Sequence, residues 1–219
     1  MEPRNPLLDE FVLSRARGRR PRIAFVGTAS GDSPLYAARF LRAFRRHRCR
    51  PSVLSLFDPP RGGLRPFVLG QDAIYVGGGN TRNLLVLWRE WGLDRILREA
   101  WREGVVLAGL SAGSVCWFEE GLSDSVVPGA LRPLPCLGFL PGSNCPHYDG
   151  EPGRRPTYRR LVASGRMRPG LAADDGAALV FEGRRFSGAV SSRPGARAWR
   201  VERRGRGAVE TEIVPEFLG

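Results

Sequence analysis

Residues 105–113 read VVLAGLSAG, and this stretch decides the fold. A short hydrophobic run leads directly into Gly109-Leu110-Ser111-Ala112-Gly113, and the following residues 114–120, SVCWFEE, are expected to form a helix. A sharp turn from strand to helix requires small residues on both sides of the serine, as in the nucleophile elbow of α/β hydrolases. Such a turn would expose the Ser111 hydroxyl above the sheet edge and place the Ala112 amide at a helix N-terminus, where it can stabilise an oxyanion. The alternative is that Ser111 only caps the next helix, because serine is a favoured N-cap residue.

The residues before this stretch alternate between strand and helix patterns. Apolar runs at 22–26 (RIAFV), 53–57 and 73–76 are typical of buried strands, and residues 35–44, 83–91 and 93–104 carry apolar side chains at helical spacing. This rhythm predicts parallel strands with helical crossovers on both faces. The expected fold is therefore an α/β, three-layer αβα sandwich with a mostly parallel, doubly wound sheet.

The second half of the chain has a different pattern. Residues 119–156 are rich in Pro, Gly and Ser and are expected to form a long functional loop. A short helix is expected over 156–163 and a strand over 177–181, and the alternating tail, 185–218, favours antiparallel strands at one sheet edge. A length of 219 residues favours a single domain covering residues 1–219.

Composition restricts the class of protein. The chain has 42% hydrophobic and 26% charged residues, as soluble globular domains do. Its net charge is +12, and all its positively charged side chains are arginines, because it contains no lysine. The arginines are spread along the chain without a nucleic-acid-binding signature, so no nucleic-acid partner is expected. The four cysteines show no close pairing, and no metal site is expected. The chain shows neither a signal peptide nor a membrane span, so we expect a cytoplasmic protein that does not enter membranes.

A glycine loop follows the third expected strand, where residues 75–81 read YVGGGNT. Three successive glycines allow the backbone to approach a ligand closely and to direct amide groups into a concave site. The loop could hold a phosphate, but neither G-x-G-x-x-G nor a Walker lysine is present. In an acyl-transfer enzyme, the amide of Gly78 or Gly79 would supply the second oxyanion donor.

A serine nucleophile needs a base, and the chain has only two histidines, His47 and His147. His47 lies at a basic helix end and is expected to be a solvated surface residue. His147 lies in the long loop, where active-site residues are commonly presented, and is the better candidate. Asp174 and Asp175, which precede the strand at 177–181, are the better candidates for the acid that orients the base.

Taken in order, YVGGGNTRNLL, AGLSAGSVCWF, the histidine loop and GLAADDGAALVF resemble the S51 serine peptidases, which comprise peptidase E (aspartyl dipeptidase) and cyanophycinase. The architecture is also similar to the class I glutamine amidotransferase domain, which has cysteine at the position of Ser111. The resemblance implies a Ser-His-acid triad in that chain order, with Asp175 at the acid position. It places the oxyanion hole at Ala112 and the loop containing Gly78 and Gly79.

The resemblance also implies a pocket for an N-terminal aspartate, in which cationic or amide side chains bind the carboxylate. Candidates for substrate binding are Asn80 and the arginines Arg82, Arg154, Arg155 and Arg159. We therefore expect a serine exopeptidase, of the aminopeptidase or dipeptidase type, that hydrolyses short peptides. No cofactor is expected, and a homodimer is the assembly to test. The alternatives are an esterase or amidase that uses the same serine, and an inactive homologue that only binds ligands.

Overall fold

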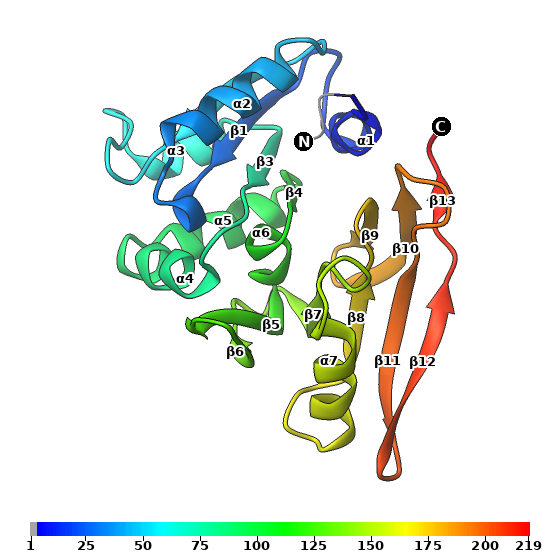
Figure 1. Cartoon of the computed structure of the whole chain (residues 1–219). Helices are drawn as coiled ribbons and strands as arrows, with labels where there is room; N and C mark the ends of the chain where they lie inside the picture. Colours follow the sequence, from blue (N-terminus) through cyan, green and yellow to red (C-terminus); the bar gives the residue numbers. More distant parts are fainter. Residues whose placement is uncertain (1–3) are drawn as a thin grey trace. The chain divides into compact units, whose positions relative to one another are not determined.

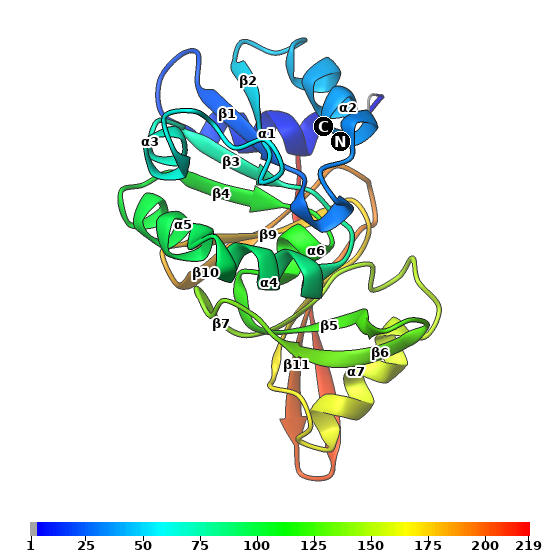
Figure 2. The same cartoon turned by 90° about the vertical axis from the view of Figure 1, so that its left-hand side faces the viewer.

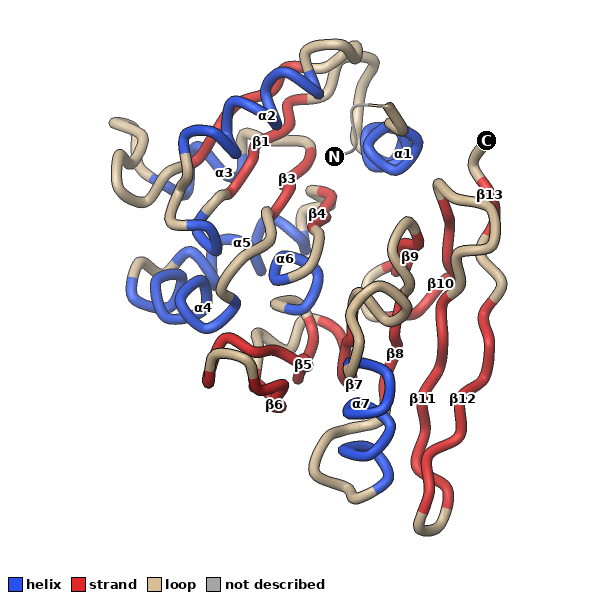
Figure 3. The backbone as a smooth tube through the Cα atoms, viewed as in Figure 1, coloured by secondary structure: helices blue, strands red, loops and turns tan. Residues whose placement is uncertain are grey.

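The computed structural model describes residues 4–219, which fall into two compact units, one ending at Ser114 and the other covering Val115–Gly219. Each unit is described separately below. Figures 1, 2 and 3 show the order and type of the elements in each unit.

The first unit is built on a four-stranded parallel sheet with the strand order β2-β1-β3-β4. Its strands are β1 (Arg22–Val26), β2 (Arg50–Leu54), β3 (Ala73–Val76) and β4 (Val106–Gly109). Its helices are α1 (Leu7–Arg15), η1 (Thr28–Ser30), α2 (Pro34–Phe44), α3 (Leu64–Leu69), α4 (Thr81–Glu90) and α5 (Leu93–Arg102). Helix α6 (Ala112–Val115) follows β4 and ends at the first residue of the second unit.

Helices cover both faces of this sheet. The side chains of Ile23, Phe25 and Tyr75 belong to one buried cluster with Phe40 and Phe44 of α2, against which side chains of α1 also pack. Figures 1 and 2 show α4 and α5 on the other side of the sheet. The predicted α/β fold, with a parallel sheet flanked by helices, is therefore confirmed.

The second unit contains two sheets (Figure 3). A six-stranded mixed sheet has the order β12-β11-β8-β7-β5-β6, and a three-stranded sheet has the order β13-β10-β9. The strands are β5 (Phe118–Val127), β6 (Ala130–Pro135), β7 (Leu140–Cys145), β8 (Gly170–Ala173), β9 (Ala177–Glu182), β10 (Arg185–Ser191), β11 (Ala198–Arg204), β12 (Gly207–Ile213) and β13 (Glu216–Phe217). Helix α7 (Arg154–Ala163) buries Tyr158, Leu161 and Val162 in a cluster with Tyr148 and Val201.

Three local predictions were wrong. Helix α6 ends at Val115 and a strand begins at Phe118, so residues 114–120 do not form a helix. The region 119–156 contains most of β5 and all of β6 and β7 instead of one long loop. Strand β2 ends at Leu54 because the Asp32 carboxylate accepts hydrogen bonds from the Ser55 hydroxyl and the Leu56 amide, which turns the chain away from the sheet. The tail does form antiparallel strands, since β11 pairs with both β12 and β8 in that sense.

Candidate active site

Ser111 lies in the turn between β4 and α6. Its φ angle is 52°, in the left-handed region that residues with a side chain rarely adopt. Only two other non-glycine residues of the described range 4–219, Asp32 and His147, share a positive φ. Such backbone geometry is costly and is concentrated at functional sites, and at a serine between a strand and a helix it is the geometry of a nucleophile elbow.

The glycines on either side of Ser111 are required by close backbone contacts. A Cβ on Gly109 would overlap the carbonyl oxygen of Gly113, and a Cβ on Gly113 would overlap the carbonyl oxygen of Val76 in the neighbouring strand. The Leu110 amide also donates a hydrogen bond of 3.2 Å to Val76. The turn is therefore held tightly against β3, as the spacing of the two glycines predicted.

The glycine loop, Gly77-Gly78-Gly79, follows β3 and lies beside the elbow. A Cβ built on Gly78 would be 3.1 Å from the Cβ of Ser111. Gly79 has a φ of 137°, and any side chain there would overlap the carbonyl oxygen of Ala29. Only glycine allows the loop to come this close to the serine on one side and to η1 on the other.

The amides of this region differ in their hydrogen bonding. The Gly78 amide donates to the hydroxyl of Tyr36 at 3.2 Å. Among the described residues 4–219, the amides of Gly79 and Ala112 have no hydrogen-bond acceptor. These two amides, in the glycine loop and directly after Ser111, are therefore available to a ligand.

His147 and Asp175 form a hydrogen-bonded pair in the second unit. The Nδ1 atom of His147 lies 2.6 Å from Oδ1 of Asp175. His147 follows β7 and Asp175 follows β8, and these strands are parallel neighbours in which Cys145 pairs with Ala172. The carboxyl ends of two adjacent parallel strands thus bring together residues that are 28 positions apart.

The loop that carries His147 wraps closely around Asp175. Oδ1 of Asp149 accepts a hydrogen bond of 2.8 Å from the Asp175 amide, and a Cβ on Gly150 would overlap Oδ2 of Asp175. His147 itself has a φ of 55°. The imidazole and the carboxylate are therefore held by their backbones as well as by their own contact.

Asp174 points to different partners. Its carboxylate accepts hydrogen bonds from the Arg197 amide at 2.9 Å and from Nε1 of Trp199 at 3.2 Å. Burial raises the pKa of Asp174 above its ordinary value, against the hydrogen bond from Arg197, and the Asp149 carboxylate raises it further. The carboxylate that contacts His147 is that of Asp175.

The candidate substrate-binding residues have varied surroundings. Glu210 forms ion pairs with Arg155 at 3.0 Å and with Arg159 at 3.1 Å, and the Arg155 guanidinium lies over the Trp199 ring. Oδ1 of Asn80 accepts a hydrogen bond from the Asn83 amide and so caps α4.

The two remaining arginines differ in exposure. Arg154 is buried and paired with Glu151, whereas Arg82, in the first turn of α4, is exposed and has no carboxylate partner among residues 4–219. Arg82 is therefore the arginine of this set that has a free cation.

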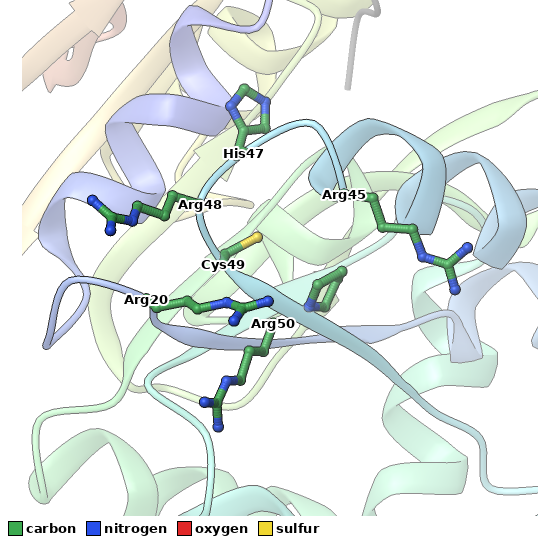
Figure 4. Close-up of a pocket in the computed structure, with 7 residues that line it drawn as sticks. Arg20, Arg45, His47, Arg48, Cys49 and Arg50 are labelled. Carbon is green, nitrogen blue, oxygen red and sulfur yellow. The ribbon is translucent and has the colours of Figure 1, made fainter.

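His47 lies in another part of the first unit. Its side chain is largely buried, and Nδ1 is 3.6 Å from Glu10. It borders a hollow of about 390 Å³ lined by Arg20, Arg45, Arg48 and Arg50, which lies near the amino ends of β1 and β2, whereas Ser111 follows the carboxyl end of β4. Figure 4 shows that the guanidinium groups of Arg45, Arg48 and Arg50 point in different directions, so they do not converge on one anion.

Residues 4–219 contain no cluster of three His, Cys, Asp or Glu side chains suited to a metal ion. Nor does any helix in this range combine the length and apolar character needed to cross a membrane.

Sequence reasoning missed Tyr36 and Gly150. Tyr36 follows the first strand by ten residues, so its helix begins at the same edge of the sheet as the glycine loop. This position along the chain is the sequence feature that indicates that Tyr36 lies near the loop. Gly150 lies three residues after the candidate base, but only the structure shows that Asp175 occupies the space that its missing side chain leaves.

The fold and the elbow together define an α/β protein of the hydrolase type, with a serine at the carboxyl edge of a parallel sheet. The sequence model of peptidase family S51 matches residues 1–188. The chain is 55% identical to the Bacillus subtilis (strain 168) protein named "Uncharacterized peptidase YgaJ" over 219 residues, which is 100% of this chain and 94% of the relative. It is 30% identical to "Peptidase E" of Streptomyces coelicolor (strain ATCC BAA-471 / A3(2) / M145) over 172 residues, or 76% and 68% of the two chains.

A solved structure has a similar fold. The crystal structure of a peptidase from an acI-B1 Actinobacterium superposes with a TM-score of 0.71 and 19% identity, covering 96% of this chain and 89% of the other. The chain belongs to peptidase family S51.

Proposed function

We propose that the protein is a serine peptidase that hydrolyses short peptides at their N-terminal end, with Ser111 as nucleophile, His147 as general base and Asp175 as the acid that orients it. Membership of a peptidase family supports the reaction class. The observation that carries the assignment is the left-handed backbone of Ser111, at a strand-to-helix turn beside a glycine loop.

The contact between His147 and Asp175 supports the role of the base. A carboxylate at Nδ1 fixes the imidazole tautomer that leaves Nε2 free to accept a proton, and it stabilises the imidazolium that then forms.

In the proposed reaction, Nε2 of His147 accepts the proton of the Ser111 hydroxyl while Oγ attacks the peptide carbonyl carbon. Backbone amides stabilise the negative charge on the carbonyl oxygen. The C–N bond then breaks, His147 gives its proton to the leaving amine, and an acyl-enzyme remains. Water attacks this ester with His147 again as base, and Ser111 regains its proton when the acid product leaves.

Peptides with an N-terminal aspartate are the substrates that the family resemblance implies, and Arg82 is the best candidate to bind the carboxylate. It has no ion-pair partner among the described residues, whereas Arg155 and Arg159 are both paired with Glu210. A free guanidinium can bind a carboxylate through two parallel hydrogen bonds. Replacement of Arg82 by Gln should raise KM for Asp-first peptides and leave KM for Ala-first peptides unchanged.

A dipeptide library varied at the first residue tests the proposal. Ser111→Ala should lower kcat by about 10⁴-fold or more without unfolding the protein, and Asp175→Asn should lower it by up to about 10⁴-fold. Ser14→Ala, a change at an exposed serine of α1, serves as the matched control and should retain full turnover.

Labelling with a fluorophosphonate probe separates the proposal from its rivals. The wild type should be labelled at Ser111, and both Ser111→Ala and His147→Ala should lose the label. Near-normal peptide turnover by Ser111→Ala would reject the nucleophile. Labelling together with turnover of simple esters but of no peptide would instead identify an esterase.

A further inference from the structure

Tyr36 contacts the glycine loop through both its ring and its hydroxyl. The hydroxyl accepts a hydrogen bond of 3.2 Å from the Gly78 amide. A Cβ on Gly77 would be 3.0 Å from Cε1 of Tyr36, and the ring packs on Phe25 with the centroids 4.9 Å apart. Helix α2 therefore supports the loop from the side of β1.

The same glycine lies against the nucleophile. A Cβ on Gly78 would lie 3.1 Å from the Cβ of Ser111 and 3.0 Å from the Leu110 side chain. Gly78 thus connects Tyr36 to Ser111, and a change in its backbone would alter the surroundings of the serine.

The hydrogen bond to Tyr36 also determines which amide of the loop is available. The Gly78 amide is already engaged, and the Gly77 amide donates to Val26 at 3.0 Å. The Gly79 amide is unengaged within residues 4–219, and the contact with Ala29 fixes its position on the other side. The loop therefore has one free donor for the developing oxyanion.

On the basis of the proposed function, we propose that Tyr36 is a positioning residue: it holds the Gly78 amide and so fixes the Gly79 amide, together with that of Ala112, as the oxyanion hole. Burial raises the pKa of the Tyr36 hydroxyl above its ordinary value, against the hydrogen bond from Gly78. The phenol is therefore uncharged at neutral pH, and it adds no negative charge beside amides that must stabilise an anion.

The test is Tyr36→Phe, which keeps the ring and removes only the acceptor. Loss of one oxyanion donor lowers kcat by about 10²–10³-fold in serine peptidases, so loss of its positioning partner should lower kcat about tenfold, with KM changed by less than about twofold. Affinity for a peptide boronic acid, which mimics the tetrahedral intermediate, should fall by the same factor as kcat/KM. Affinity for the unreactive product peptide should not change.

Tyr75→Phe is the matched control. Tyr75 is a buried tyrosine of the same aromatic cluster, and it lies in β3, the strand that leads into the loop. The variant is expected to lower stability at most and to keep the wild-type kcat. It therefore shows whether a general loss of stability alone can lower turnover.

Two results would overturn the inference. Unchanged kcat and boronate affinity in Tyr36→Phe would show that the hydroxyl does not position the loop. Equal losses of affinity for the boronate and the product peptide would show a substrate-binding contact instead.

Should the variant fail to fold, amide NMR of the wild type tests the same inference. Boronate binding should shift the Gly79 and Ala112 amide protons strongly and the Gly78 amide proton little. A dominant shift at Gly78 would reject the proposal.

These results are separable from a failure of the proposed function. Activity in Ser111→Ala would reject the nucleophile itself. Inactive Ser111→Ala combined with unaffected Tyr36→Phe would reject only the role of Tyr36.

Discussion

Left-handed backbone at single residues is the most informative feature at the residue scale. Ser111 and His147 share this conformation with Asp32, whose carboxylate holds the Ser55 hydroxyl and the Leu56 amide at the end of β2. A residue with a side chain in this region costs about 1–3 kcal/mol, which the surrounding contacts must offset. The contacts of Asp32 identify a structural role, whereas Ser111 and His147 carry the groups that the proposed chemistry needs.

The residues of the candidate site differ in how far sequence could predict them. Ser111 is marked by its flanking glycines, and His147 by the scarcity of histidine, so both could be named from the chain alone. Asp174 and Asp175 could not be separated by local pattern, since adjacent carboxylates turn to opposite sides and only the fold shows that one meets His147 and the other Trp199. The position of Tyr36 after the first strand indicates only that it lies at the same sheet edge as the glycine loop, and its hydrogen bond to Gly78, 42 positions away, is visible only in the fold.

Gly150 provides a prediction at the same scale. Replacement by Ala would place a methyl group on Oδ2 of Asp175 and force that carboxylate away from His147, so kcat should fall by at least about tenfold, as for a misplaced catalytic group. Steady-state kinetics on the best dipeptide would measure the effect. Gly207→Ala, where the added Cβ makes only an ordinary contact of 3.7 Å, is the control, and an equal effect of both changes would contradict the prediction.

At the scale of elements, sequence pattern predicted the first unit better than the second. Strand β3 is buried throughout, and β1 is buried at every residue after Arg22, so their apolar runs are continuous and easily recognised. The strands β5 to β7 contain Gly, Pro and Ser, and their burial alternates irregularly, so no period was visible. Backbone pairing with neighbouring strands, which composition does not reveal, holds them in the sheet.

Helix α4 provides a prediction at this scale. Asn80 caps its N-terminus through the Asn83 amide at 2.9 Å, so Asn80→Ala should lower the free energy of unfolding by about 1 kcal/mol. Asn80→Asp keeps an oxygen acceptor and places a negative charge at the positive end of the helix, so its stability should match the wild type. Urea unfolding would measure both.

The pair of variants also tests the expected substrate contact of Asn80. Lower turnover in Asn80→Asp at unchanged stability would support a role of the amide in binding. Wild-type stability of Asn80→Ala would contradict the capping role.

At the scale of the whole molecule, several buried groups hold protons more firmly in the folded chain than in the unfolded one. Burial raises the pKa of the Cys145 thiol to about 12. Burial likewise raises the pKa of four tyrosines above the usual range: Tyr36, Tyr75, Tyr148 and Tyr158. In the unfolded chain the thiol titrates near pH ~8.5 and the phenols near pH ~10.

These shifts predict instability in alkali. Above pH ~8.5 the unfolded chain releases protons that the folded chain retains, so the free energy of unfolding should fall as pH rises, by up to about 1.4 kcal/mol per pH unit for each group. Urea unfolding followed by tryptophan fluorescence at pH 7.5, 9 and 10.5 would measure the slope. Tyr158→Phe removes one of these groups and should make the slope shallower, and a stability that does not change between pH 9 and 10.5 would contradict the prediction.

The position of the arginine-lined hollow has a practical consequence. The turn that contains Arg45 and Arg48 lies at the amino end of the parallel sheet in the first unit, and the serine turn follows the opposite end. A cysteine introduced at exposed Arg48 would give a handle for coupling the protein to a bead or a sensor chip. Immobilised through this handle, the first unit would keep Ser111 directed away from the support.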